Sequence, residues 1–246
     1  MLGMTCKLAV FSLFLILFLS PAYPYALLRE GPSSSAGSGT EEYSLEKALD
    51  ILNESDWARQ QTVTQVVSGV GSGEYGEKEI FSRYYIRILS APPIRKAYES
   101  IRKQMKQDHP DASLHGNLDL SAYDDSRFLV IGVAFRSNHP DLEGMVLNNF
   151  RSQTVETLQN RAYLSTTRFP QVRLAEYAAP SDPAIGAQFV FPRLIDGESV
   201  ISPGDTSFAF ELDLPGRRVP ELRVTFPVTD AVVGNSSAIA GGTGAT

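Results

Sequence analysis

The stretch RFLVIGVAFRS, residues 127–137, constrains the fold of this chain more than any other. Apolar side chains occupy both of its alternating faces, which is typical of a strand that is covered on each side. Such a strand belongs inside a sheet that has packing layers on both faces. We therefore expect residues 127–137 to form the central strand.

Three amphipathic patterns predict helices that could cover this sheet. Residues 44–55 repeat apolar side chains at helical spacing behind Ser44, a favourable N-cap residue. Residues 94–107 follow two prolines and place their lysines and arginines opposite the apolar face. The third pattern starts near Pro140 and predicts the longest helix of the mature chain. Its apolar face consists of Leu142, Met145, Val146, Phe150 and Leu158.

Two further strands are expected upstream of the central one. Residues 61–67, QTVTQVV, are rich in β-branched side chains, and residues 79–89, EIFSRYYIRIL, add aromatic ones. Trp57 lies just before the first of these strands, and we interpret it as a packing anchor. The glycine-rich residues between the strands predict a hairpin tip.

The last third of the chain changes character. Short alternating runs, QVRLAEY, AQFVFPRL, SFAFELDL and ELRVTFPV, are separated by turn residues such as Asp196-Gly197 and Pro215-Gly216. These runs predict an antiparallel meander. Within SFAFELDL the inward side chains are expected to be Phe208, Phe210, Leu212 and Leu214. The side chains expected to face water are Ser207, Glu211 and Asp213.

These patterns predict the α+β fold class, with helices packed on a largely antiparallel sheet and a C-terminal β-meander. A single domain is expected over residues 42–230. Residues 23–41 contain GPSSSAGSGT and are expected to form a flexible Gly/Ser-rich linker, and residues 231–246 a disordered tail.

The N-terminus has the layout of a secretory signal peptide, residues 1–22. Lys7 precedes an apolar core at residues 8–19, and small residues make Ala22 or Ala26 the expected cleavage position. That core is too short to cross about 30 Å of hydrocarbon at 1.5 Å per residue. The alternative is an uncleaved anchor, the one case in which we expect membrane contact. Both interpretations place the body outside the cytoplasm, in the periplasm, on the envelope or secreted.

Cysteine content and charge exclude several functions. Cys6 precedes the apolar core and is the one cysteine of the chain. The mature protein is therefore expected to have no disulfide, thiol nucleophile or cysteine-bound metal. The formal net charge is −6, and it becomes more negative when Lys7 is removed. An acidic body repels phosphate backbones, so nucleic acid is not expected as a partner.

The candidate metal ligands are His109, Asp111 and His115. Their imidazole and carboxylate groups could bind zinc or another divalent ion, and His139 and Asp141 could join them if the loops meet. The spacing matches no established metal pattern, and the alternative is a solvated polar loop. We expect no cofactor, with a divalent metal as the alternative.

Residues 71–76, GSGEYG, match Gly-x-Gly-x-x-Gly. A dinucleotide site also needs a helix that opens at the last glycine. The sequence after Gly76 is strand-like instead. We interpret the motif as part of the hairpin tip.

YYIRILSAPPIRKAY together with His109-Pro110-Asp111 resembles the first helix, the basic second helix and the turn of J-domain co-chaperones. That resemblance implies action on a heat-shock ATPase. The distance from Tyr98 to His109 is about three residues too long for the family pattern, which displaces the tripeptide by about 4.5 Å on a helix. No apolar third helix follows Asp111. We interpret the stretch as coincidental.

Four longer stretches, DWARQQTVTQVVSGVGSGE, YYIRILSAPPIRKAY, SQTVETLQNRAYLSTTRFPQV and FVFPRLIDGESVISP, resemble an uncharacterised family of bacterial exported proteins. The resemblance implies export and a single body, and it transfers no catalytic residue. We expect a non-enzymatic binding or structural module that contacts another envelope protein through an exposed strand edge or the glycine-rich hairpin. The alternative is a divalent-metal-dependent enzyme that uses the loop from His109 to His115.

Overall fold

The central strand is β3 (Phe128–Ser137), and it lies in the middle of a five-stranded sheet as predicted. The computed structural model describes residues 42–67, 78–108, 123–215 and 221–233. All pairings in this first sheet are antiparallel, and its strand order is β1-β2-β3-β7-β6. The other strands are β1 (Ala58–Val67), β2 (Lys78–Ile88), β6 (Glu176–Ala178) and β7 (Ala187–Pro192).

A second antiparallel sheet has the order β11-β10-β4-β5. Its strands are β4 (Ala162–Ser165), β5 (Val172–Arg173), β10 (Ser207–Leu212) and β11 (Leu222–Pro227). The α+β class and the C-terminal meander of antiparallel strands are confirmed. The meander is divided between the sheets, because β6 and β7 join the first sheet, β10 and β11 join the second, and β8 and β9 form a separate two-stranded sheet.

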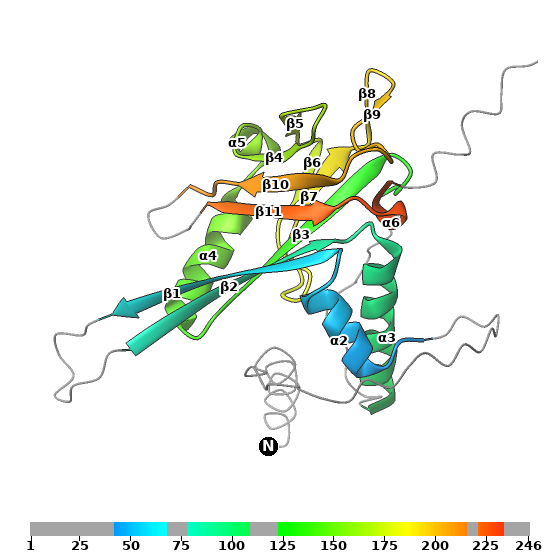
Figure 1. The fold of residues 1–246 in the computed structure, drawn as a ribbon. Helices are drawn as coiled ribbons and strands as arrows, with labels where there is room; N and C mark the ends of the chain where they lie inside the picture. Colours follow the sequence, from blue (N-terminus) through cyan, green and yellow to red (C-terminus); the bar gives the residue numbers. More distant parts are fainter. Residues whose placement is uncertain (1–41, 68–77, 109–122, 216–220, 234–246) are drawn as a thin grey trace, which may run out of the picture.

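Both faces of the first sheet are covered (Figure 1). On one face, Phe189 and Phe191 of β7 pack edge-on against Phe210 of β10, at centroid distances of 5.4 and 6.1 Å. On the other face, Arg87 of β2 contacts Tyr98 and Leu52, which belong to two helices. This double cover explains why β3 is apolar on both sides.

The two helices on that face pack against each other (Figure 1). They are α2 (Leu45–Asn53), capped by Ser44 as predicted, and α3 (Pro92–Asp108). Ala97, Tyr98 and Met105 of α3 are buried as expected. Tyr84 to Leu89, the stretch that resembles a J-domain helix, lies in and just after strand β2. This placement supports the interpretation that the J-domain resemblance is coincidental.

The third predicted helix is shorter than expected. α4 (Pro140–Ser152) has 13 residues, whereas α3 has 17. The chain is extended at Gln153 and Thr154, and a new helix, α5 (Val155–Leu158), begins with a capping box between Thr154 and Thr157. Residues 162–165 then form strand β4. The apolar spacing continues to Leu158, but the capping box of Thr154 and Thr157 starts a new helix there and does not extend α4.

Two side-chain predictions are wrong. Met145 was expected on the buried face of α4, but it is 44% exposed. Glu211 was expected to face water, but it is only 8% exposed and accepts a hydrogen bond from Tyr163 Oη at 2.8 Å. Because β10 lies between β4 and β11, side chains of both neighbours cover its outward face. Phe208, Phe210, Leu212 and Leu214 are buried as predicted.

The predicted Asp196-Gly197 turn joins β8 (Leu194–Ile195) to β9 (Glu198–Ser199). Both turn residues have positive φ, 51° and 83°, as a type I′ turn requires. The last helix is α6 (Asp230–Val233). Just before it, Thr229 Oγ1 accepts a hydrogen bond from Trp57 Nε1 at 3.0 Å. Trp57 is partly buried against the core, so its interpretation as a packing anchor holds.

Several predictions concern residues outside the described ranges. They are the signal peptide 1–22, the linker 23–41, the glycine motif 71–76 and most of the tail 231–246. Among the described residues, no helix has both the length and the apolar character needed to cross a membrane.

The single domain over residues 42–230 stays a prediction, and limited proteolysis can test it. Cleavage between residues 108 and 126 would separate α2, β1, β2 and α3 from the rest of the chain. We expect the two fragments to co-elute in size-exclusion chromatography, because β2 and β3 pair from Ser82–Ser137 to Ile88–Ile131. Fragments that separate without denaturant would show two independent domains.

Candidate functional site

The predicted metal ligands His109, Asp111 and His115 lie outside the described residues, so the metal hypothesis stays untested. His139 is described, and its Nδ1 accepts a hydrogen bond from Leu142 N at 3.4 Å as the N-cap of α4. Asp141 lies in the first turn of the same helix. Within the described ranges, no three His, Cys, Asp or Glu side chains are grouped to share an ion.

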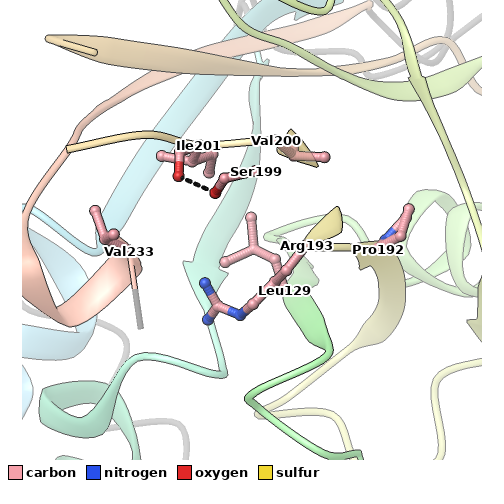
Figure 2. A pocket seen from close by; sticks show the side chains of 7 residues that line it. All are labelled: Leu129, Pro192, Arg193, Ser199, Val200, Ile201 and Val233. Carbon is pink, nitrogen blue, oxygen red and sulfur yellow. Dashed lines mark hydrogen bonds between the residues drawn. The ribbon is translucent and has the colours of Figure 1, made fainter. Parts of the chain in front are cut away.

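A shallow hollow lies between β7, the β8–β9 hairpin and the end of α6 (Figure 2). Arg193 Nε donates to Asp125 O at 2.6 Å and to Phe128 O at 3.1 Å, and Arg193 Nη1 donates to Val232 O. Ser199 Oγ donates to Ile201 O at 2.7 Å. Burial lowers the pKa of Arg193. These hydrogen bonds to backbone carbonyls hold neighbouring segments together, which indicates a structural role for the side chains that line the hollow.

Arg87 is a second unusual group, because its side chain is almost fully buried at 2% exposure. Its Nε donates to Leu52 O at 2.6 Å, and its Nη1 donates to Tyr98 Oη and Ala184 O, both at 2.9 Å. Nη2 has no partner among the described residues. The guanidinium joins β2, α2, α3 and the loop before β7 and is closed to solvent, which indicates a structural role.

The edges of the two larger sheets are a third possibility, and three of these four edges are protected. β6 has three residues and β5 has two, so each offers little backbone to a partner. β11 is longer, but side chains of β1 bind one carbonyl in it and one just before it. Arg59 Nε donates to Thr225 O at 3.2 Å, and Gln61 Nε2 donates to Glu221 O at 3.3 Å.

The fourth edge belongs to β1. Ala58 at its start is bridged to Ser55, so we call the outer backbone of residues 60–67 the β1 edge. β1 has ten residues, and among the described strands it pairs only with β2. Residues 60–67, QQTVTQVV, contain no charge, proline or glycine. Natural proteins protect long edge strands with such residues or with bulges. The β1 edge therefore combines length with a lack of protection.

The far half of the β1–β2 hairpin extends beyond the rest of the first sheet (Figure 1). The pairing of β2 with β3 stops at Ser82 and Ser137. Beyond it, Asn138 Oδ1 accepts from Phe81 N at 2.8 Å, and Asn138 Nδ2 donates to Glu79 O at 3.0 Å. Asn138 thus covers the β2 side of the hairpin, which leaves β1 as the side open to another strand.

No protein-family model, curated protein or solved structure matches the chain. The resemblance to exported bacterial proteins therefore stays a prediction. The candidate site rests on the geometry of the β1 edge.

Proposed function

We propose that this chain is an exported, non-enzymatic binding module that holds an extended segment of another envelope protein along the β1 edge. The observation that carries the proposal is the outer backbone of β1 over residues 60–67, which pairs with no other described strand. An added strand would hydrogen bond to the outer N–H and C=O groups of β1, a recurring mode of peptide recognition.

The surroundings of β1 favour one added strand on the first sheet. Arg59 and Gln61 point from β1 toward β11 and bind the carbonyls of Thr225 and Glu221. The second sheet therefore offers fewer free acceptors beside the site. Residues 60–67 carry no charge, so the strand itself adds no electrostatic barrier to a partner backbone.

Export is part of the proposal and rests on the sequence. The apolar core at residues 8–19 with Lys7 before it supports delivery across a membrane. A chain with no cysteine after Cys6 needs no disulfide to fold in an oxidising compartment.

Photo-crosslinking tests the proposed site in cells that make the protein. We place a benzoylphenylalanine at Thr64, an exposed position of β1, and a matched one at Glu198, which is exposed in the β8–β9 hairpin. We expect the Thr64 position to give one main adduct whose attachment points, mapped by mass spectrometry, fall in one short segment of the partner. The Glu198 position should not give this adduct.

Two results would contradict the proposal. The same adduct from both positions would indicate contact unrelated to the β1 edge. If neither the probe at Thr64 nor a second probe at Thr62 gives an adduct, the β1 edge is not the binding site.

A further inference from the structure

Phe81 and Arg83 of β2 lie on one face of the extended hairpin. Phe81 pairs directly with Thr64 of β1, and Arg83 pairs with Thr62. Residues two apart on a strand point to the same side of the sheet. Phe81 is 42% exposed, so an apolar side chain and a cation lie side by side, one strand away from the β1 edge.

Arg83 brings positive charge to this face. Its one hydrogen bond among the described residues is to Tyr85 Oη at 3.5 Å. Arg136 of β3 lies directly opposite it, and Glu143 pairs with Arg136 at 3.1 Å. Glu143 is bound to Arg136, and the exposed Glu79 lies on the same face, four residues before Arg83 along β2. None of the described carboxylates forms an ion pair with Arg83, so its charge is available to a partner.

The residues between Arg83 and the β1 edge leave room for a long side chain. Thr62 and Thr64 are short and exposed. An added strand would lie about 4.8 Å from β1, and thus about 10 Å from β2. A glutamate on that strand, opposite Thr62, and the long side chain of Arg83 can together span this distance over the threonine.

We infer that the segment held at the β1 edge carries an acidic side chain two residues away from an apolar one. The acidic group pairs with Arg83, and the apolar group covers Phe81. This inference rests on the proposed function, and it identifies the partner as an extended protein segment with acidic and apolar side chains on one face.

Synthetic peptides test this recognition with the purified, full-length protein. The probe is a capped peptide of threonine and valine with a central Phe-Thr-Glu-Thr-Phe, which suits either strand direction. Binding is measured by calorimetry at low salt. We expect replacement of the glutamate by glutamine to weaken binding about two- to fivefold, the range of a cross-strand ion pair. This comparison leaves the protein unchanged, so folding does not affect it.

Protein variants give the reciprocal test. R83E should reject the glutamate peptide and bind a lysine version of it, which restores the pair with reversed charges. F81A should weaken the peptide with phenylalanines more than one with threonines at those positions. The matched control is R173Q, which changes an exposed arginine on β5 of the second sheet and should leave affinity unchanged.

Each other outcome overturns a distinct statement. If the glutamate and glutamine peptides bind equally, Arg83 does not recognise an acidic side chain, although the peptide still docks at the β1 edge. N-methylation removes backbone N–H donors, and two peptides methylated at alternate residues cover both sets of N–H groups. If both methylated peptides bind as tightly as the unmethylated one, the peptide does not dock as an added strand at the β1 edge. No binding of any peptide would overturn the inference, while the crosslinking experiment would still judge the proposed function. The protein alone could also sediment as a dimer that a Thr64→Lys change dissociates. That result would show that a second copy of this chain, and not another protein, occupies the β1 edge.

Discussion

Replacing Gly186 with alanine should be the most damaging small change in the protein, with a loss of about 3 kcal/mol or more in the free energy of unfolding. Gly186 has φ of 78°, a conformation that side chains disfavour. A Cβ at this position would overlap the carbonyl carbon and oxygen of Val133 and lie 2.5 Å from the Cα of Ala134. These are backbone atoms of the central strand, so relief requires β3 itself to move. Urea denaturation measures the effect.

Gly197→Ala is the matched control. Gly197 also has positive φ, 83°, but an added Cβ would meet no atom within 4 Å. The expected loss is therefore only the conformational term, about 1 to 2 kcal/mol. If both variants lose the same stability, the close approach of residue 186 to β3 carries no energetic weight.

Replacing Arg87 with methionine should lower the free energy of unfolding by about 2 to 4 kcal/mol. Two effects oppose each other here. Methionine removes a buried charge and its desolvation penalty, but it also removes the donors to Leu52 O, Ala184 O and Tyr98 Oη. Leu52 O keeps no other side-chain donor among the described residues. We expect the lost hydrogen bonds to prevail, because the guanidinium joins four segments of the fold.

Thermal or urea unfolding of Arg87→Met beside Arg173→Met checks this ranking. The exposed Arg173 should change stability by less than about 0.5 kcal/mol. A loss below about 1 kcal/mol at Arg87 would mean that relief from burying the charge offsets the hydrogen bonds.

Local sequence patterns predicted the parts of the fold that depend on local physics. The doubly apolar run at residues 127–137 identified the central strand, because a strand with both faces covered needs apolar side chains on both. Ser44 marked the start of α2, and Pro140 the start of α4, through the chemistry of helix ends. Asp196-Gly197 marked a hairpin, because a type I′ turn needs positive φ twice.

Features set by distant parts of the chain were not predictable in this way. The burial of Glu211 depends on Tyr163, 48 residues away in the sequence. Near residue 153 the backbone N–H groups can be satisfied by a continued helix or by the side chains that cap a new one. The apolar pattern is the same in both cases and so does not predict where α4 ends. The division of the C-terminal strands between two sheets likewise depends on which faces need cover.

The candidate site also has a part that local sequence predicted and a part that depends on distant segments. The uncharged run QTVTQVV, residues 61–67, was predicted as a strand, and an exposed strand edge was expected without being assigned to a particular strand. Which strand forms the edge depends on the strand order β1-β2-β3-β7-β6. The shared face of Phe81 and Arg83 beside β1 depends on the register that pairs them with Thr64 and Thr62.

The hydrogen bond between Trp57 and Thr229 spans 172 residues and joins the beginning of the fold to its end. Arg59 and Thr225 make a similar long connection. Contacts of such long sequence separation slow folding, because a large loop must close before they form. A chain that leaves a ribosome or a translocation channel N-terminus first cannot complete its core until almost the last described residue has emerged. Trp57 is the one tryptophan of the chain, so its fluorescence would record the moment at which the two ends of the fold meet.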